Sequence, residues 1–79
     1  MDKKIVDDVK RVAYSVLKDE NILKQDNCDL SQVENMDSVR RVSILVAIED
    51  EYDFIFKLKE ISAWNTVYEL ADIIEHKLQ

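Results

Sequence analysis

The sequence contains no glycine and no proline among its 79 residues. Glycine supplies the positive backbone angles of several tight turns, and proline fixes the backbone of many others. A chain without either residue is poorly suited to β-hairpins, whose short loops depend on them. Nearly half of the residues are apolar, which is enough to form a folded core. The composition therefore favours an all-helical fold whose connections are made from Asn, Asp and Ser.

The sequence also has few cysteines, an excess of negative charge and no long apolar run, and these features narrow the class of protein further. The single cysteine, Cys28, cannot form an internal disulfide. The formal charge of −6 would repel a nucleic acid, so a positively charged protein surface is the better partner. The longest apolar run, Ile44 to Ile48, is too short to span a bilayer, and Met1 to Lys4 lacks the apolar segment of a secretory signal. We expect a monomeric cytoplasmic protein that neither binds nucleic acid nor inserts into a membrane.

The spacing of apolar residues divides this single domain into helical segments. The first helix is predicted near residues 3–18, the second at 38–52, and a short element of uncertain type at 58–63. The last helix follows Thr66, which forms a capping box with Glu69. A long polar loop, residues 19–37, joins the first two helices. Its expected apolar anchors are Ile22, Leu23, Leu30 and Val33.

The second helix carries more apolar residues than one buried face requires. Its core-facing stripe is predicted to consist of Val39, Val42, Leu45, Val46 and Tyr52. Successive helical residues advance by about 100°, so the apolar run at 44–48 covers the whole circumference. We therefore expect Ile44 or Val46 to face a cargo or a partner. The core is expected to hold Val9, Val12, Val16, Val42, Leu45, Phe56, Trp64, Leu70 and Ile74.

Ser38 begins this second helix directly after Asp37. Alone, the pair predicts only a helix cap, because both residue types are common at helix starts. A hydroxyl there also lies where free backbone amides and the helix dipole favour a phosphate group. The sequence shows no nucleophile paired with a base, and the one histidine, His76, is expected to be solvated. We therefore predict no catalytic residue and no metal site.

The segments around this serine follow a recognisable order. Asp37-Ser38-Val39 precedes an apolar helix and the acidic run Glu49 to Asp53, and Trp64-Asn65-Thr66-Val67 opens the last helix. Over essentially the whole chain, this order resembles the acyl carrier proteins. The resemblance implies an all-α four-helix bundle over residues 1–79, with three longer helices, one short helix and a long first loop. It also implies a non-catalytic carrier with 4′-phosphopantetheine covalently attached to Ser38, and with Asp37 as part of the attachment motif.

The resemblance also implies a cargo and a set of partners. The cargo would be a thioester for fatty-acid, polyketide or specialised acyl biosynthesis. The partners would be a phosphopantetheinyl transferase, an acyl- or aminoacyl-activating enzyme, and a synthase or transferase. A D-alanyl or other aminoacyl carrier is the alternative, because Ala47-Ile48-Glu49 and Trp64-Asn65-Thr66 are equally similar to that subgroup. An unmodified helical interaction module, in which Ser38 is only a cap, is the alternative of another class.

The chain also departs from the family pattern near the serine. Asn35 stands where glycine is usual, and we expect it to adopt the left-handed conformation. Arg40 and Arg41 stand where acidic or small polar residues are common. Either both are solvated, or one screens the phosphodiester and the other meets an acidic patch on a partner. The predicted partner surface comprises Val39, Arg40, Arg41, Ile44, Val46, Glu49 and Asp50.

Overall fold

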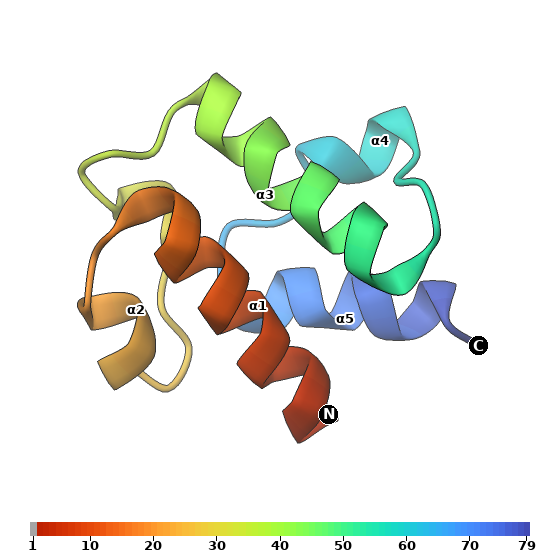
Figure 1. Ribbon diagram of the computed structural model, residues 1–79, viewed down its shortest axis with the longest axis horizontal. Helices are drawn as coiled ribbons and strands as arrows, with labels where there is room; N and C mark the ends of the chain where they lie inside the picture. The colour runs from red at the N-terminus through yellow and green to blue at the C-terminus, as the bar shows by residue number, and fades with distance from the viewer. Residues whose placement is uncertain (1) are drawn as a thin grey trace.

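The computed structural model describes residues 2–79, and the regular elements in that range are all helical. Three longer helices form the body of the domain: α1 (Lys3–Leu17), α3 (Ser38–Tyr52) and α5 (Val67–Lys77). α1 packs against both of the others, as Figure 1 shows. The predicted all-α class and its three longer helices are confirmed, and α3 has the predicted bounds.

Three short elements lie in the connections between the longer helices. They are α2 (Asn21–Lys24), the 3₁₀ turn η1 (Leu30–Gln32) and α4 (Leu58–Ile61). α4 is the short element expected near 58–63, whereas α2 adds a fifth α-helix to the predicted four. Within residues 2–79, β-type pairing is limited to one isolated bridge, between Asp29 and Thr66.

The core is one cluster of buried side chains contributed by the three longer helices and the loops. Among its members are these predicted core residues: Val9, Val12, Leu45, Phe56, Trp64, Leu70 and Ile74. Val16 is partly buried and packs against this cluster, whereas the prediction for Val42 is wrong, because Val42 is 47% exposed. The error at Val42 reflects the orientation of the whole α3 helix.

α3 turns a different face to the core from the one predicted. Its buried residues are Ile44, Leu45 and Ile48, and its exposed valines are Val39, Val42 and Val46. Ile44 is completely buried, so the prediction that it faces a cargo or partner is wrong. Of the expected pair, only Val46 faces outward, at 47% exposure. Residues three and four positions apart share a helix face, which places the exposed valines together on one side.

The first loop, residues 19–37, is held by buried anchors and by contact with the start of α5. Ile22 and Leu30 are completely buried, as predicted. Leu23 is 49% exposed, so its predicted anchoring role is wrong. The Leu30 amide donates a hydrogen bond of 2.7 Å to the Asn65 carbonyl, which ties the loop to the residues just before α5.

Two helices end on residues with positive φ, and in this chain, which contains no glycine, both residues carry a side chain. Lys18 has φ 58° at the end of α1, and Asp53 has φ 59° at the end of α3. Asn35 does not have a positive φ, so the prediction of a left-handed Asn35 is wrong. Instead, its side-chain Nδ2 donates a hydrogen bond of 3.0 Å to the Leu17 carbonyl, which joins the loop to the end of α1.

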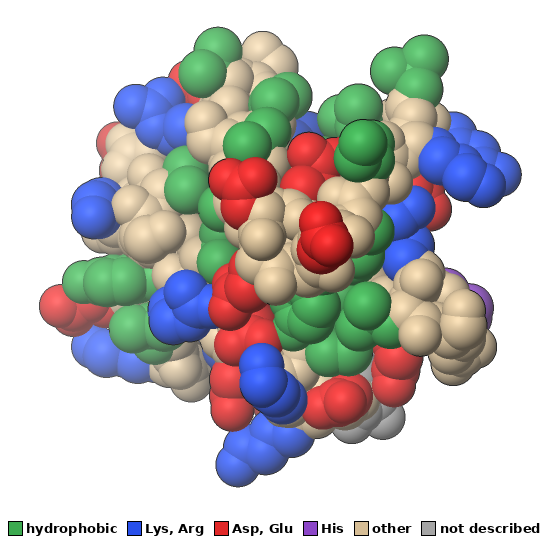
Figure 2. All heavy atoms as spheres, turned by 45° about the vertical axis from the view of Figure 1, so that its right-hand side comes forward, with side chains coloured by type: hydrophobic (Ala, Val, Ile, Leu, Met, Phe, Trp, Pro, Cys, Tyr) green, Lys and Arg blue, Asp and Glu red, His purple; other side chains and the backbone are tan. Residues whose placement is uncertain are grey.

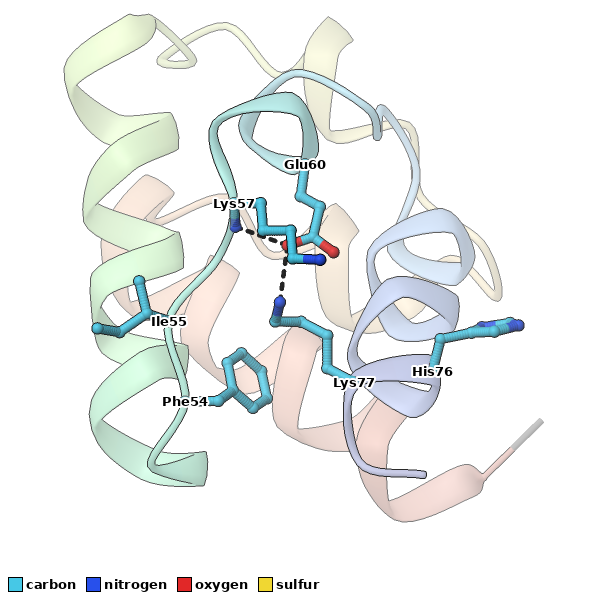
Figure 3. A pocket seen from close by; sticks show the side chains of 6 residues that line it. All are labelled: Phe54, Ile55, Lys57, Glu60, His76 and Lys77. Carbon is cyan, nitrogen blue, oxygen red and sulfur yellow. Dashed lines mark hydrogen bonds and ion pairs between the residues drawn. The ribbon is translucent and has the colours of Figure 1, made fainter.

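The short helix α4 is fastened to α5 by an ion pair. Lys77 Nζ lies 2.8 Å from Glu60 Oε1, and both side chains are largely shielded from solvent. Figure 3 shows the Lys77 side chain reaching toward Glu60 past the ring of Phe54. The ammonium group lies 5.4 Å from the centre of the Phe54 ring and 5.7 Å from that of Phe56. Glu60 also accepts a hydrogen bond of 2.6 Å from the Lys57 amide at the start of α4.

Candidate functional site

Ser38 is the first residue of α3, and it is exposed. The residue before it, Asp37, is the N-cap, and its Oδ1 accepts a hydrogen bond of 2.8 Å from the Arg40 amide. Capping is therefore the task of Asp37, and within residues 2–79 the Ser38 hydroxyl has no hydrogen-bond partner. The serine presents its hydroxyl to solvent at the end of the helix where the dipole is positive.

The start of α3 lies far from both ends of the chain, as Figure 1 shows. A shallow and mainly apolar hollow adjoins the serine, lined by Ser38, Val39, Val42 and Ser43. Val39 is 71% exposed. Exposed apolar groups beside an exposed hydroxyl can cover an attached molecule or meet a partner.

Arg40 is tied to the capping residue rather than extended into solvent. Its Nη1 lies 2.6 Å from Asp37 Oδ2. The Arg40 backbone amide and then its guanidinium hold the pKa of the Asp37 carboxyl below its ordinary value. The ion pair holds the Arg40 guanidinium at the helix start, two residues after Ser38 in the sequence. That one arginine screens a phosphodiester on Ser38 therefore stays a prediction, and Arg40 is the candidate.

Arg41 has a different environment from its neighbour. Its Nη1 donates hydrogen bonds to the carbonyls of Ile61, at 3.2 Å, and Trp64, at 2.9 Å. Its guanidinium carbon lies 4.1 Å from the centre of the Trp64 ring, a cation–π contact. Arg41 therefore joins α3 to the end of α4 and the segment after it, and its predicted place on the partner surface stays a prediction. Both bonds to carbonyls come from the same nitrogen, Nη1.

The acidic run at the end of α3 also contributes to the fold. Glu49 Oε2 accepts a hydrogen bond of 2.8 Å from the Phe56 amide, so this member of the predicted partner surface holds the next segment in place. Glu51 pairs with Arg11 of α1. Asp50 is exposed, consistent with a surface position. Figure 2 shows acidic side chains in the middle of this side of the molecule, with apolar side chains around them.

Two other reactive side chains do not form a site. The Cys28 thiol is buried, and burial is the main reason that its pKa is raised, which disfavours the reactive thiolate. His76 is exposed and contacts the Asp72 carbonyl, which raises the pKa of the imidazole. Residues 2–79 contain no cluster of three or more His, Cys, Asp or Glu side chains that could hold a metal ion. In the same range, no helix is both long and apolar enough to cross a membrane.

Sequence reasoning missed the residues that fasten α3 and α4. Arg41 is predicted to be solvated or to meet a partner, although its spacing from Ile44, Leu45 and Ile48 places it on the buried stripe. Lys77 and Glu60 are 17 positions apart, and nothing in the sequence pattern pairs them.

The fold and the site together define a small helical protein with one exposed serine hydroxyl at the start of its second long helix. No family of known proteins, no curated protein and no solved structure matches the chain.

Proposed function

We propose that this chain is a carrier protein that holds an acyl group as a thioester on a phosphopantetheine arm attached to Ser38. The observation that carries the proposal is that Asp37, and not Ser38, caps α3. Asp37 takes the capping bond, and Ser38 is left exposed with its hydroxyl unused. A serine retained only as a cap would be expected to accept that bond itself.

The attachment reaction needs only the serine hydroxyl from this chain. Ser38 Oγ forms a bond to the phosphorus that carries the pantetheine in coenzyme A. The bond from that phosphorus to the leaving phosphate breaks, releasing adenosine 3′,5′-bisphosphate, and the hydroxyl proton passes to the transferase that catalyses the step. The product is a phosphodiester on Ser38 with a free thiol at the far end of the arm. An activating enzyme then transfers the acyl group from an acyl adenylate to that thiol, which gives up its proton, and AMP is released with formation of the thioester.

The residues around Ser38 fit such a phosphodiester. The start of a helix favours a negatively charged group, because the backbone dipoles point their positive ends toward it. The carboxylate of Asp37 would repel the phosphate, and its ion pair with Arg40 offsets that repulsion. The exposed valines at 39 and 42 offer an apolar surface against which the arm can lie.

The proposed cargo is an acyl group from fatty-acid, polyketide or specialised acyl biosynthesis, and an aminoacyl group is the alternative. The partners proposed are a phosphopantetheinyl transferase, an activating enzyme and a synthase or transferase. The arrangement into three longer helices with a long first loop supports the acyl-carrier-like architecture. An unmodified interaction module would use the same exposed valines without any change at Ser38.

Intact-mass spectrometry tests the attachment directly. The full chain is incubated with coenzyme A and a phosphopantetheinyl transferase of broad specificity, and we expect one phosphopantetheine per chain, on Ser38. The Ser38→Ala variant should keep its helical circular dichroism and gain no mass. Ser43→Ala is the matched control, since Ser43 is also exposed on α3 but its hydroxyl donates to the Val39 carbonyl at 3.0 Å. A wild-type chain that gains no mass, or a modified Ser38→Ala chain, would overturn the carrier proposal.

A further inference from the structure

The segment that leads from α3 into α4 carries the two most exposed large apolar side chains of residues 2–79. Leu58 is 85% exposed and Ile55 is 79% exposed. Between them, Phe56 is buried in the core and its amide donates to Glu49 of α3, so the course of the segment is fixed. Exposed apolar groups that lie close together on a well-held segment commonly mark an interaction site.

An open hollow of about 380 Å³ lies beside this segment, between it, α4 and the end of α5. Figure 3 shows the side chains of Lys57, Glu60 and Lys77 converging above the ring of Phe54. Ile55 also lines the hollow, but its side chain points away from this group and forms an outer edge. The hollow therefore combines charged groups, an aromatic wall and an exposed apolar rim.

The charged groups in the hollow have an excess of positive charge. Its one carboxylate, Glu60, accepts a hydrogen bond of 2.8 Å from Lys77 Nζ. Lys57 and the nearby Lys59 are exposed, and neither forms an ion pair with any residue in the range 2–79. An ammonium group has three donors, so Lys57 and Lys77 retain donors for a second carboxylate.

We propose that this hollow and the exposed residues beside it bind a short acidic and apolar segment of a partner protein. A carboxylate of that segment would enter the hollow and bind Lys57 and Lys77, and its apolar side chains would cover Ile55 and Leu58. The charge complementarity is local, because the chain as a whole carries a charge of −6 and favours cationic partners elsewhere. The inference goes beyond the carrier function and does not depend on Ser38.

A peptide fits this face better than a lipid bilayer does. Asp50 and Asp53 are exposed and come shortly before the segment in the chain, and Figure 2 shows acidic side chains in the middle of this side of the molecule. A flat anionic bilayer that took up Ile55 and Leu58 would also meet these carboxylates, which its own charge repels. A narrow peptide can avoid them. The hollow is also at the lower end of the sizes that enclose a small molecule, which suits a single side chain.

Fluorescence anisotropy with labelled peptides tests the site on the full chain. The probe is a short peptide in which Glu and Leu alternate, and its control is the same peptide with Lys in place of Glu. We expect the wild-type chain to bind the Glu peptide and not the Lys peptide. The affinity should fall as salt is added, because the contact is partly electrostatic. Ser38→Ala should bind the Glu peptide as the wild type does.

Two substitutions at the site should weaken binding without disturbing the fold, because both side chains are exposed. Lys57→Gln removes a cation and Leu58→Ser removes an apolar contact, and each should reduce the affinity about tenfold. The matched controls are Lys3→Gln at the start of α1 and Leu23→Ser in α2, which are exposed elsewhere on the molecule (Figure 1). Both controls should bind as the wild type does.

Other results would identify a different occupant or none. A Glu peptide that binds no better than the Lys peptide overturns the inference, and so does binding that Lys57→Gln and Leu58→Ser leave unchanged. Sedimentation with phosphatidylglycerol vesicles that is lost in Leu58→Ser would show that the face binds a bilayer instead. Dimerisation that is lost in Leu58→Ser would show that it binds a second copy. Each of these results leaves the carrier proposal intact, because the mass gained at Ser38 tests that proposal separately.

Discussion

The Asp37 carboxylate binds Arg40 twice, through the backbone amide at 2.8 Å and through the guanidinium at 2.6 Å. One acidic residue thus caps α3 and neutralises a cation in its first turn, where a positive charge is otherwise unfavourable. The same arrangement leaves Ser38 without a structural task.

The Asp37 cap should depend on pH. Hydrogen bonds from Arg40 hold the pKa of Asp37 below its ordinary value of 3.8, so the ionised carboxylate stabilises the fold at neutral pH. That contribution is lost as the pH falls through the lowered pKa of the folded state. Asp37→Asn keeps a capping oxygen without the charge. We expect the wild type to unfold at a higher urea concentration than Asp37→Asn at pH 7, with the difference shrinking below pH 4. A difference that does not change with pH would contradict this.

The two adjacent arginines should differ in their effect on stability. Arg41→Gln removes a half-buried guanidinium that serves two carbonyls, and we expect the free energy of unfolding to fall by about 2 kcal/mol. Arg40→Gln removes only an exposed ion pair and should have a much smaller effect. Urea unfolding followed by circular dichroism measures both. Equal effects would show that the contacts of Arg41 contribute nothing beyond those of a surface charge.

Three consecutive residues of α3 report which face of this helix is buried. Ile44 and Leu45 are 0% and 3% exposed, so truncating either to alanine should cost about 2–5 kcal/mol. Val46 is 47% exposed, and Val46→Ala should change stability by no more than about 0.5 kcal/mol. Denaturant unfolding of the three single variants gives the comparison. A loss at Val46 as large as at Ile44 would mean that α3 is buried on all sides.

Tyr52 and Asp8 join the end of α3 to α1, and this contact should be visible in a titration. The Tyr52 hydroxyl donates a hydrogen bond to Asp8 Oδ2. Burial raises the pKa of Asp8, but hydrogen bonds from Lys4 and Tyr52 outweigh it and hold this pKa below its ordinary value. Tyr52→Phe should therefore raise the pKa of Asp8, measured by NMR, and lower the free energy of unfolding by about 1–2 kcal/mol.

The stability lost in Tyr52→Phe should itself depend on pH. A carboxylate with a lowered pKa in the folded state stabilises at neutral pH, and this stabilisation disappears on acidification. The wild type and Tyr52→Phe should therefore approach each other in stability as Asp8 becomes protonated. An unchanged Asp8 pKa in the variant would show that the hydroxyl does not act on this carboxylate in solution.

The sequence was sufficient to predict the three longer helices, because each carries apolar residues at helical spacing and polar residues at its ends. The bounds of α3 were also predictable, because Asp37 and Ser38 are typical of a helix start and the apolar run of the helix gives way to an acidic segment. The exposure of Ser38 followed from the same reasoning.

The orientation of α3 was not predictable by counting apolar residues. Val39 and Val42 are the residue type of a buried stripe, and Arg41 is not, so the first two turns of α3 indicate the wrong face. A long charged side chain can nevertheless start on a buried stripe when its tip reaches carbonyl groups and an aromatic ring, as Arg41 does at Trp64. Those partners are twenty or more positions away, and their position depends on the tertiary fold.

The absence of glycine has a consequence for engineering. Lys18 and Asp53 hold left-handed backbone conformations that strain a residue with a Cβ atom, and glycine commonly ends helices in this way. Asp53 closes the end of α3 remote from Ser38, about 20 Å along a helix of this length. A glycine at position 18 or 53 should therefore raise the melting temperature without disturbing the serine. Lys18→Gly and Asp53→Gly would thus make the domain more heat-stable. A more stable domain with one modifiable serine suits use as a scaffold for attaching chemical groups at a single point.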